Sequence, residues 1–215
     1  MKQLYIFAPG RDTTVPERWK VGAGEALTAC FIVLPGVSAE LTLDVDVVGE
    51  GASVMFAGAW ICGADERVNV TVRLHHRCGR SSSRQLFNGI AGGSSSAEFF
   101  GKIVIDPDAQ QVEAFQENHN ILLSDTATVR TRPQLEIYAD DVKCSHGATT
   151  GKLSAEEQFY MRSRGIPEDE ARVLQMISFL SPVLEAVEDS LRDETAALLE
   201  AAVRQITVMP DQGRA

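Results

Sequence analysis

Cysteine is scarce in this chain of 215 residues, and its four copies are scattered at positions 30, 62, 78 and 144. No C-x-x-C pair occurs, which argues against a disulfide framework, a zinc ribbon and a self-contained ferredoxin motif. Dispersed thiols of this kind are typical of a reduced protein, so we expect a cytoplasmic location.

Basic charge and long apolar runs are also in short supply. The chain has 20 basic and 30 acidic side chains and a net charge of -10, which disfavours nucleic acid and anionic membrane surfaces as partners. Its apolar stretches are far shorter than the ~20 residues that cross a bilayer. The first ten residues carry one positive charge and a very short apolar run, so they do not match a secretory signal.

Phosphate-binding loops are missing as well. The runs 81–83 and 92–96 are rich in Ser and Gly, but neither contains the G-x-x-x-x-G-K-[ST] pattern, and both are interpreted as turns or loops. We therefore do not expect the chain to hydrolyse ATP.

What the sequence does contain is an alternation of apolar and polar residues with a period of two. Apolar side chains alternate with polar ones over 41–47 and 68–74, and another apolar run begins at Val54. Further short strands are predicted around 85–87, 99–105, 111–115, 121–123, 127–129, 135–137 and 142–144. The strands start about a dozen residues apart at first and roughly seven apart later, and no helical pattern occurs between 41 and 150.

Many short strands at near-regular spacing fit a sandwich, a barrel or a β-solenoid. The solenoid is favoured because few connections resemble tight hairpin turns, and because the run Asn118-His119-Asn120 would allow polar side chains to stack between successive turns. Residues 1–40 are poorly patterned, and Trp19 and Lys20 are not placed.

Helical signals begin near position 154. Ser154 followed by Glu157 is a capping box, Gly165 ends that helix, and Pro167 suits the first turn of a second one. A third helix is predicted to start at Ser181-Pro182, and the tail after Met209-Pro210 is expected to fray. We therefore divide the chain into a β body, 1–153, and a helical region, 154–215. The helical region is either a solvated cap or a docking surface for another protein.

Longer motifs between Arg80 and Phe179 carry a resemblance to a known family. They are SSSRQLFNGI at 81–90, FGKIVI at 100–105 with AQ at 109–110, Asn118 and Asn120 before ILLS at 121–124, RPQLEIYADDVKCSHGAT at 132–149 and FYMRSRGIP at 159–167. This set resembles the SufB/SufD family of iron–sulfur cluster assembly scaffold proteins, and more closely its SufD side. The resemblance covers nearly half of the chain.

The resemblance implies a right-handed parallel β-helix followed by a C-terminal helical region. It implies a scaffold that is not an enzyme and that dimerises across the end of the β-helix, with a second copy or a SufB-like chain as partner. The helical region would bind an ABC-type ATPase, and the complex would hold a transient iron–sulfur cluster for transfer to apoproteins. Only about 80 residues precede the strong match. Members of the family usually have more there, so the chain is either a short member or a fragment.

Cys144 and His146 form the best soft-metal pair in the chain. Thiolate and imidazole both bind iron, and a spacing of two places both side chains on one face of a strand. The resemblance implies that both residues lie at the subunit junction, where a second chain completes the site. Asp140 and Asp141 would orient the histidine or form a turn. By default, a lone Cys is a small core residue and a lone His a hydrogen-bonded structural group.

Three alternatives accompany this hypothesis. His75, His76 and Cys78 form a second, weaker candidate metal cluster. A polysaccharide-active β-helix enzyme is another possibility, although only 7% of residues are aromatic and no sugar-stacking platform is evident. The third is a dimeric scaffold that binds no cluster.

Overall fold

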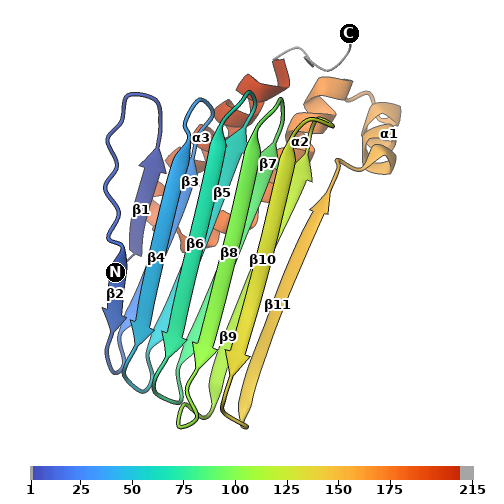
Figure 1. Ribbon diagram of the computed structural model, residues 1–215. Coiled ribbons are helices and arrows are strands. Elements are labelled where there is room, and N and C mark those ends of the chain that lie inside the picture. Colours follow the sequence, from blue (N-terminus) through green and yellow to red (C-terminus); the bar gives the residue numbers. More distant parts are fainter. Residues whose placement is uncertain (1, 209–215) are drawn as a thin grey trace.

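Eleven strands, which are parallel within each of two sheets, and a group of C-terminal helices make up the structure, a computed structural model that describes residues 2–208 (Figure 1). The strands are β1 (Lys2–Phe7), β2 (Arg18–Val21), β3 (Ala26–Val33), β4 (Ala39–Val47), β5 (Ser53–Cys62), β6 (Arg67–His76), β7 (Ser82–Ala91), β8 (Ser96–Ile105), β9 (Val112–Leu122), β10 (Thr128–Ile137) and β11 (Val142–Gly151). The helices are α1 (Ala155–Ser163), α2 (Glu168–Leu180), a 3₁₀ helix η1 (Ser181–Ala186) and α3 (Asp189–Val208).

Successive strands alternate between two facing sheets. The odd-numbered strands form a six-stranded sheet in the order β1-β3-β5-β7-β9-β11, and the even-numbered strands form a five-stranded sheet in the order β10-β8-β6-β4-β2. Every pairing within a sheet is parallel and in register, as between β7 and β9. The two sheets run in opposite directions, so the chain winds as a flattened solenoid (Figure 1). The prediction of a parallel β-helix followed by helices is confirmed.

The predicted strand lengths were wrong in the second half of this solenoid. The segments 111–115 and 121–123 belong to the single strand β9, and the segments 127–129 and 135–137 belong to the single strand β10. The interval of about seven residues therefore reflects two halves of each long strand. The unassigned first forty residues contain β1, β2, β3 and the start of β4, and Trp19 and Lys20 lie in β2.

The main core lies between the two sheets. In β6 every second residue is buried, as the period of two predicts. Aromatic side chains fill the space opposite, where Phe31 stacks on Tyr5 and meets the edge of Phe56. Because the side chains of successive turns stack above one another, this core runs continuously through the solenoid.

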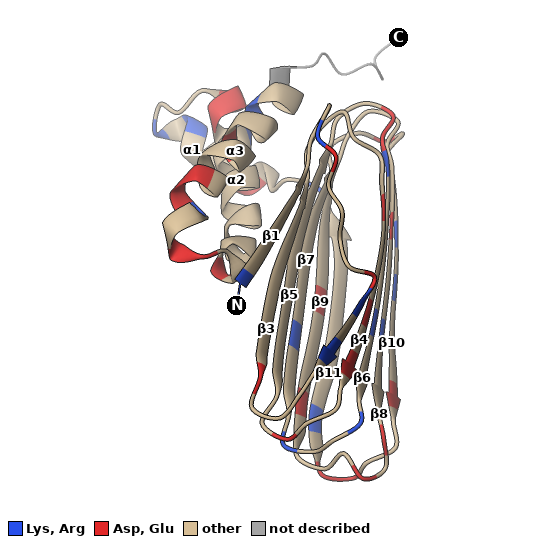
Figure 2. Cartoon of the chain, turned by 90° about the vertical axis from the view of Figure 1, so that its left-hand side faces the viewer, with Lys and Arg blue, Asp and Glu red and all other residues tan. Residues whose placement is uncertain are grey.

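A second core lies on the outer face of the odd-numbered sheet, where the helices cover part of the strands (Figure 2). Apolar residues of β3, β5 and β7 that point away from the solenoid pack against α2, η1 and α3. This is why β5 is buried on both faces over its second half. Among the described residues, no helix is long and apolar enough to span a membrane.

The helix boundaries follow the expected signals with two differences. Ser154 caps α1, since its hydroxyl accepts a hydrogen bond from the Glu157 N–H at 3.2 Å. Pro167 is the cap residue before α2, one position ahead of the first turn. The third helix was predicted as one element from Ser181, but extended backbone at Val187 separates η1 from α3. The tail predicted to fray lies outside the described residues.

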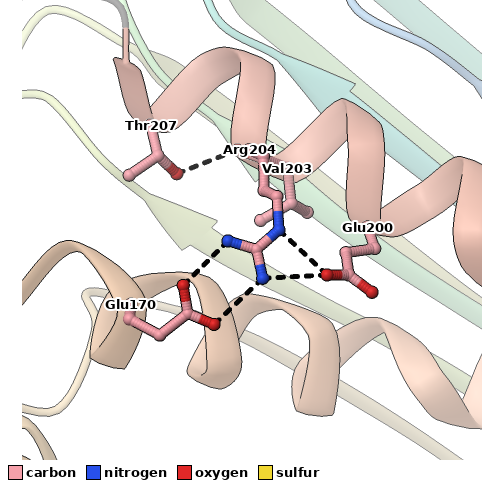
Figure 3. A network of polar contacts seen from close by, with 5 residues as sticks. All are labelled: Glu170, Glu200, Val203, Arg204 and Thr207. Atoms are coloured by element: carbon pink, nitrogen blue, oxygen red, sulfur yellow. Dashed lines mark hydrogen bonds and ion pairs between the residues drawn. The ribbon is translucent and has the colours of Figure 1, made fainter. Parts of the chain in front are cut away.

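A charged cluster joins α2 to α3 (Figure 3). The Arg204 guanidinium donates to both carboxylate oxygens of Glu170 at 2.8 and 2.9 Å, and to Glu200 one turn away at 2.9 Å. Such a two-pronged contact fixes the relative orientation of the two helices more firmly than a single ion pair would.

Candidate functional site

Cys144 and His146 lie on β11, the edge strand of the odd-numbered sheet (Figure 1). This strand pairs only with β9, so the N–H and C=O groups on its other side face no strand. The even-numbered sheet likewise ends at β10. We call the surface formed by these two edge strands the β10–β11 end.

The register places both side chains on the inner face of β11. Cys144 pairs with Ala114 and His146 with Gln116, and both partners are buried between the sheets. Paired residues of parallel strands point to the same side of the sheet. Cys144 is half-buried and packs against a small cluster around Ile103, whereas His146 is exposed. The two side chains therefore lie on the inner surface that the solenoid presents at this end.

Burial raises the pKa of the Cys144 thiol, and a hydrogen bond from the Ala114 backbone partly opposes that shift. The free thiol is therefore protonated at neutral pH. Because iron binds the thiolate, metal binding at this position would release a proton and become tighter as pH rises.

Polar side chains line the interior directly beneath this surface. Gln116 Nε2 donates to Gln85 Oε1 at 2.9 Å, and Asn118 Oδ1 accepts from Thr131 at 2.6 Å and from Asn120 at 2.9 Å. Asn118 and Asn120 therefore bond within one strand and to the facing strand, whereas the predicted side-chain contact between successive turns is made by the Gln85–Gln116 pair and by His119 with Thr149. Sequence reasoning missed the two glutamines as part of this arrangement.

Neighbouring residues of the predicted site have structural roles. His119 points to the outer face and bonds Thr149 Oγ1 at 2.8 Å. Asp141 belongs to a turn, since its backbone N–H donates to Gln110 Oε1 and its carbonyl accepts from Gln111 N. The alternative that the acidic pair forms a turn is thus the one that the hydrogen bonds of Asp141 support.

The second candidate cluster does not converge. His75 bonds Asp106 at 2.6 Å, whereas His76 points inward and bonds two serine hydroxyls, and Cys78 Sγ donates to the carbonyl oxygen of Val48. His75 and His76 are consecutive on β6 and so face opposite sides of the sheet. Within residues 2–208, no three His, Cys, Asp or Glu side chains are grouped to hold a metal ion.

A separate exposed surface lies on the helices. No residue of α1 is buried, and Phe159 and Tyr160 are 74% and 60% exposed. Leu174 of α2 is 41% exposed, so apolar side chains of both helices reach solvent. Large exposed apolar side chains in one region are typical of a protein contact site.

Comparison with known proteins gives a family match that includes strands of both sheets of the solenoid and extends into the first two helices. Residues 15–179 match the family model described as "SUF system FeS cluster assembly, SufBD core domain". This range spans most of the described solenoid together with α1 and nearly all of α2.

Individual relatives agree with this match. The chain is 43% identical over 116 residues to the iron–sulfur cluster assembly protein SufD of Escherichia coli strain K12, which covers 54% of this chain and 27% of that protein. It is 40% identical over 126 residues to the protein ABCI7, chloroplastic, of Arabidopsis thaliana, covering 56% of this chain and 26% of that protein.

A longer alignment joins the chain to the iron–sulfur cluster assembly protein SufD of Bacillus subtilis strain 168, at 30% identity over 201 residues. It covers 92% of this chain and 43% of that protein, so the chain spans less than half the length of these relatives. The family match, the solenoid and the helices that follow it lead to one conclusion: the chain belongs to the SufBD family of the SUF system.

Proposed function

We propose that this chain is a scaffold component of iron–sulfur cluster assembly that presents Cys144 and His146 to a nascent cluster where two subunits meet. The observation that carries the proposal is a pair of soft ligands on the exposed inner surface of the β10–β11 end. One thiol and one imidazole are too few to enclose a cluster. A second chain meeting this end would supply the remaining ligands.

The unpaired backbone groups of this end support strand pairing through β11. Pro133 lies in the middle of β10 and has no N–H to donate, whereas β11 contains no proline and one of its edges is unpaired. A partner strand would therefore add more readily to β11 than to β10. The partner is another copy of the chain or a longer SufB-like chain, which would bring its ligands to the inner surface.

The exposed apolar residues of α1 support a second contact. We assign Phe159 and Tyr160 to the docking surface for an ABC-type ATPase, which would supply the conformational work that opens the junction and releases the cluster to apoproteins. In this proposal the chain acts as a scaffold in the cytoplasm and catalyses no reaction itself.

Anaerobic loading with ferrous iron and sulfide tests the cluster site. We expect thiolate-to-iron charge-transfer absorbance in the wild-type chain and its loss in Cys144→Ala and His146→Ala. Cys78→Ala is the matched control, because Cys78 is also a partly exposed free thiol but lies away from the β10–β11 end. Equal loading in all four proteins would reject the site and leave a scaffold that holds no cluster.

Light scattering tests the helical contact. The chain is mixed with the ABC-type ATPase from the same source, and we expect the mass of a complex for wild type and its absence for Phe159→Glu. Leu191→Glu is the control, since Leu191 is a large exposed side chain on α3. If Phe159→Glu still forms the complex, α1 is not the docking surface.

A further inference from the structure

We propose that Gln116 is a positioning residue for His146. Its carboxamide oxygen would accept a hydrogen bond from one imidazole N–H, so that the lone pair of the other ring nitrogen points out of the solenoid toward the cluster. This inference rests on the proposed function, because it assigns a partner to a residue that the proposed function treats as a ligand.

The register brings the two residues together. Gln85 pairs with Gln116 and Gln116 pairs with His146, so the three side chains form one row on the inner face of the odd-numbered sheet. Neighbouring strands lie about 4.8 Å apart, which lets a glutamine side chain reach an imidazole stacked above it. The sequence separates Gln116 from His146 by thirty positions, and only the winding of the solenoid makes them neighbours.

One polar atom of the Gln116 carboxamide has no hydrogen-bond partner. The Nε2 of this side chain donates to Gln85 Oε1 at 2.9 Å, which directs the other end of the amide away from that bond. The Oε1 is buried and has no hydrogen-bond partner within the described residues. Water cannot serve as that partner readily, because Gln116 is only 1% exposed. An enclosed acceptor without a donor is unfavourable, so a nearby N–H would be stabilised there.

His146 is the natural donor on that side. Its two neighbours on the inner face of β11 are Cys144 and Ala148, of which one is a weak donor and the other has no polar side-chain atom. Across the interior Pro133 pairs with Gly101 and has neither a side-chain donor nor a backbone N–H. Thr131 of the facing strand already donates to Asn118, and the unpartnered Gln85 Nε2 lies on the β7 side of Gln116. The imidazole N–H is therefore the strongest side-chain donor that the register places on the β11 side of Gln116.

Gly101 holds the amide in place by leaving room for it. A Cβ added at Gly101 would lie 2.2 Å from Gln116 Nε2 and 2.7 Å from Oε1, so the glutamine extends across the interior to the opposite sheet. A side chain at position 101 would displace this amide without changing Gln116 or His146.

The chemical consequence is control of the tautomer. Neutral imidazole has one N–H and one lone pair, and a metal ligand must keep its lone pair on the side of the metal. Histidine ligands usually donate their other N–H to an acceptor, which sets both tautomer and ring orientation. The structure shows no hydrogen bond between His146 and Gln116, so the exposed imidazole would turn inward to make it. This turn needs no iron, so its effect is measurable in the metal-free chain.

The experiment is a long-range ¹H–¹⁵N correlation spectrum of the metal-free, ¹⁵N-labelled chain, in which the imidazole nitrogens of His146 report the tautomer directly. We expect one dominant tautomer in wild type and in Gln116→Glu, which keeps an acceptor oxygen. We expect a mixture in Gln116→Leu and in Gly101→Ala. Gln85→Leu, the same substitution one turn farther from His146, should keep the wild-type tautomer.

Iron loading of the same variants separates this inference from the proposed function. Iron affinity should fall about 10–100-fold in Gln116→Leu and stay unchanged in Gln85→Leu. An unchanged tautomer in both Gln116→Leu and Gly101→Ala, each folded by circular dichroism, would overturn the positioning role. The tautomer could shift in Gln116→Leu while iron loading stays unchanged in both Gln116→Leu and His146→Ala. In that case Gln116 still positions His146, and the proposed cluster site is rejected.

Discussion

At the scale of single residues, His76 is held in the interior by two serines. Ser81 Oγ donates to the Cys78 carbonyl at 3.0 Å and so accepts from His76 Nδ1–H at 2.8 Å, while Ser83 donates to Nε2 at 2.9 Å. This network suits a neutral imidazole. Burial, together with the neighbouring His75, lowers the pKa of His76 to about 4.

The depressed pKa predicts an acid-sensitive fold. In the unfolded chain this imidazole binds a proton with its ordinary pKa of 6.5, so the stabilisation is complete above that pH and is lost as pH falls toward 4. The loss from this group is about 3 kcal/mol. Urea unfolding at pH 7.5 and 4.5 should show this loss in wild type and a smaller one in His76→Gln. Equal losses in the two proteins would contradict the assignment, and His119→Gln is the control.

The close packing around Gly89 predicts that a side chain at this position would destabilise the interior between the two sheets. A Cβ at this position would lie 2.1 Å from Trp60 Nε1 and 2.5 Å from Asn120 Oδ1. Gly89→Ala should therefore lower the free energy of unfolding by about 1–3 kcal/mol through overpacking. Gly147→Ala is the control, because nothing lies within 4 Å of the Cβ that it adds. Equal free energies of unfolding for the two variants would contradict this prediction and show that the interior relaxes around the new methyl group.

Residues differ in how far the sequence reveals their role. Cys144 and His146 are recognisable because a spacing of two is a local property of any strand. Gln116 is not, because its relation to His146 depends on a pairing thirty positions long, and the chain has no strict repeat from which to read that interval.

At the scale of elements, the strands that sequence reasoning misjudged are those whose faces break the usual rule. In β9 the inner positions 116, 118 and 120 are polar, so the apolar alternation disappears in the middle and one strand resembles two. In β3 the last five residues are all buried, because the helices cover one face and the core the other. Alternation predicts a strand only when one of its faces meets water.

The contact between α2 and α3 predicts a salt-dependent effect. Arg204→Met removes the bonds to Glu170 and Glu200, so its melting temperature should be lower than that of wild type in 50 mM NaCl. The difference should shrink in 1 M NaCl, where charges are screened beyond about 3 Å. Arg73→Met is the control, since Arg73 forms a surface ion pair with Asp44 between two strands and contacts no helix. A deficit independent of salt would mean that the methylene stem of Arg204 matters more than its charge.

At the scale of the whole molecule, each turn of the solenoid contacts only the turns beside it, apart from the layer of helices. Stability in such an array is a sum of neighbour contacts, so end turns open more readily than inner ones. Amide hydrogen exchange should therefore be faster in β10 and β11 than in β5 and β7. Binding of a partner chain should slow exchange in β11 selectively. Uniform protection across the strands would show that the solenoid opens as one unit.

The helices that cover one sheet also shape how this family is free to vary. In β6 each second residue is exposed or half-exposed, so half of its positions tolerate exchange, and sequence drift there should leave a visible two-residue rhythm. In β5 almost every residue of the second half is enclosed, and no such rhythm is available. In a saturation library of the chain, the odd-numbered strands should therefore tolerate few substitutions where the helices cover them. Among relatives, sequence divergence should fall mainly on the even-numbered strands.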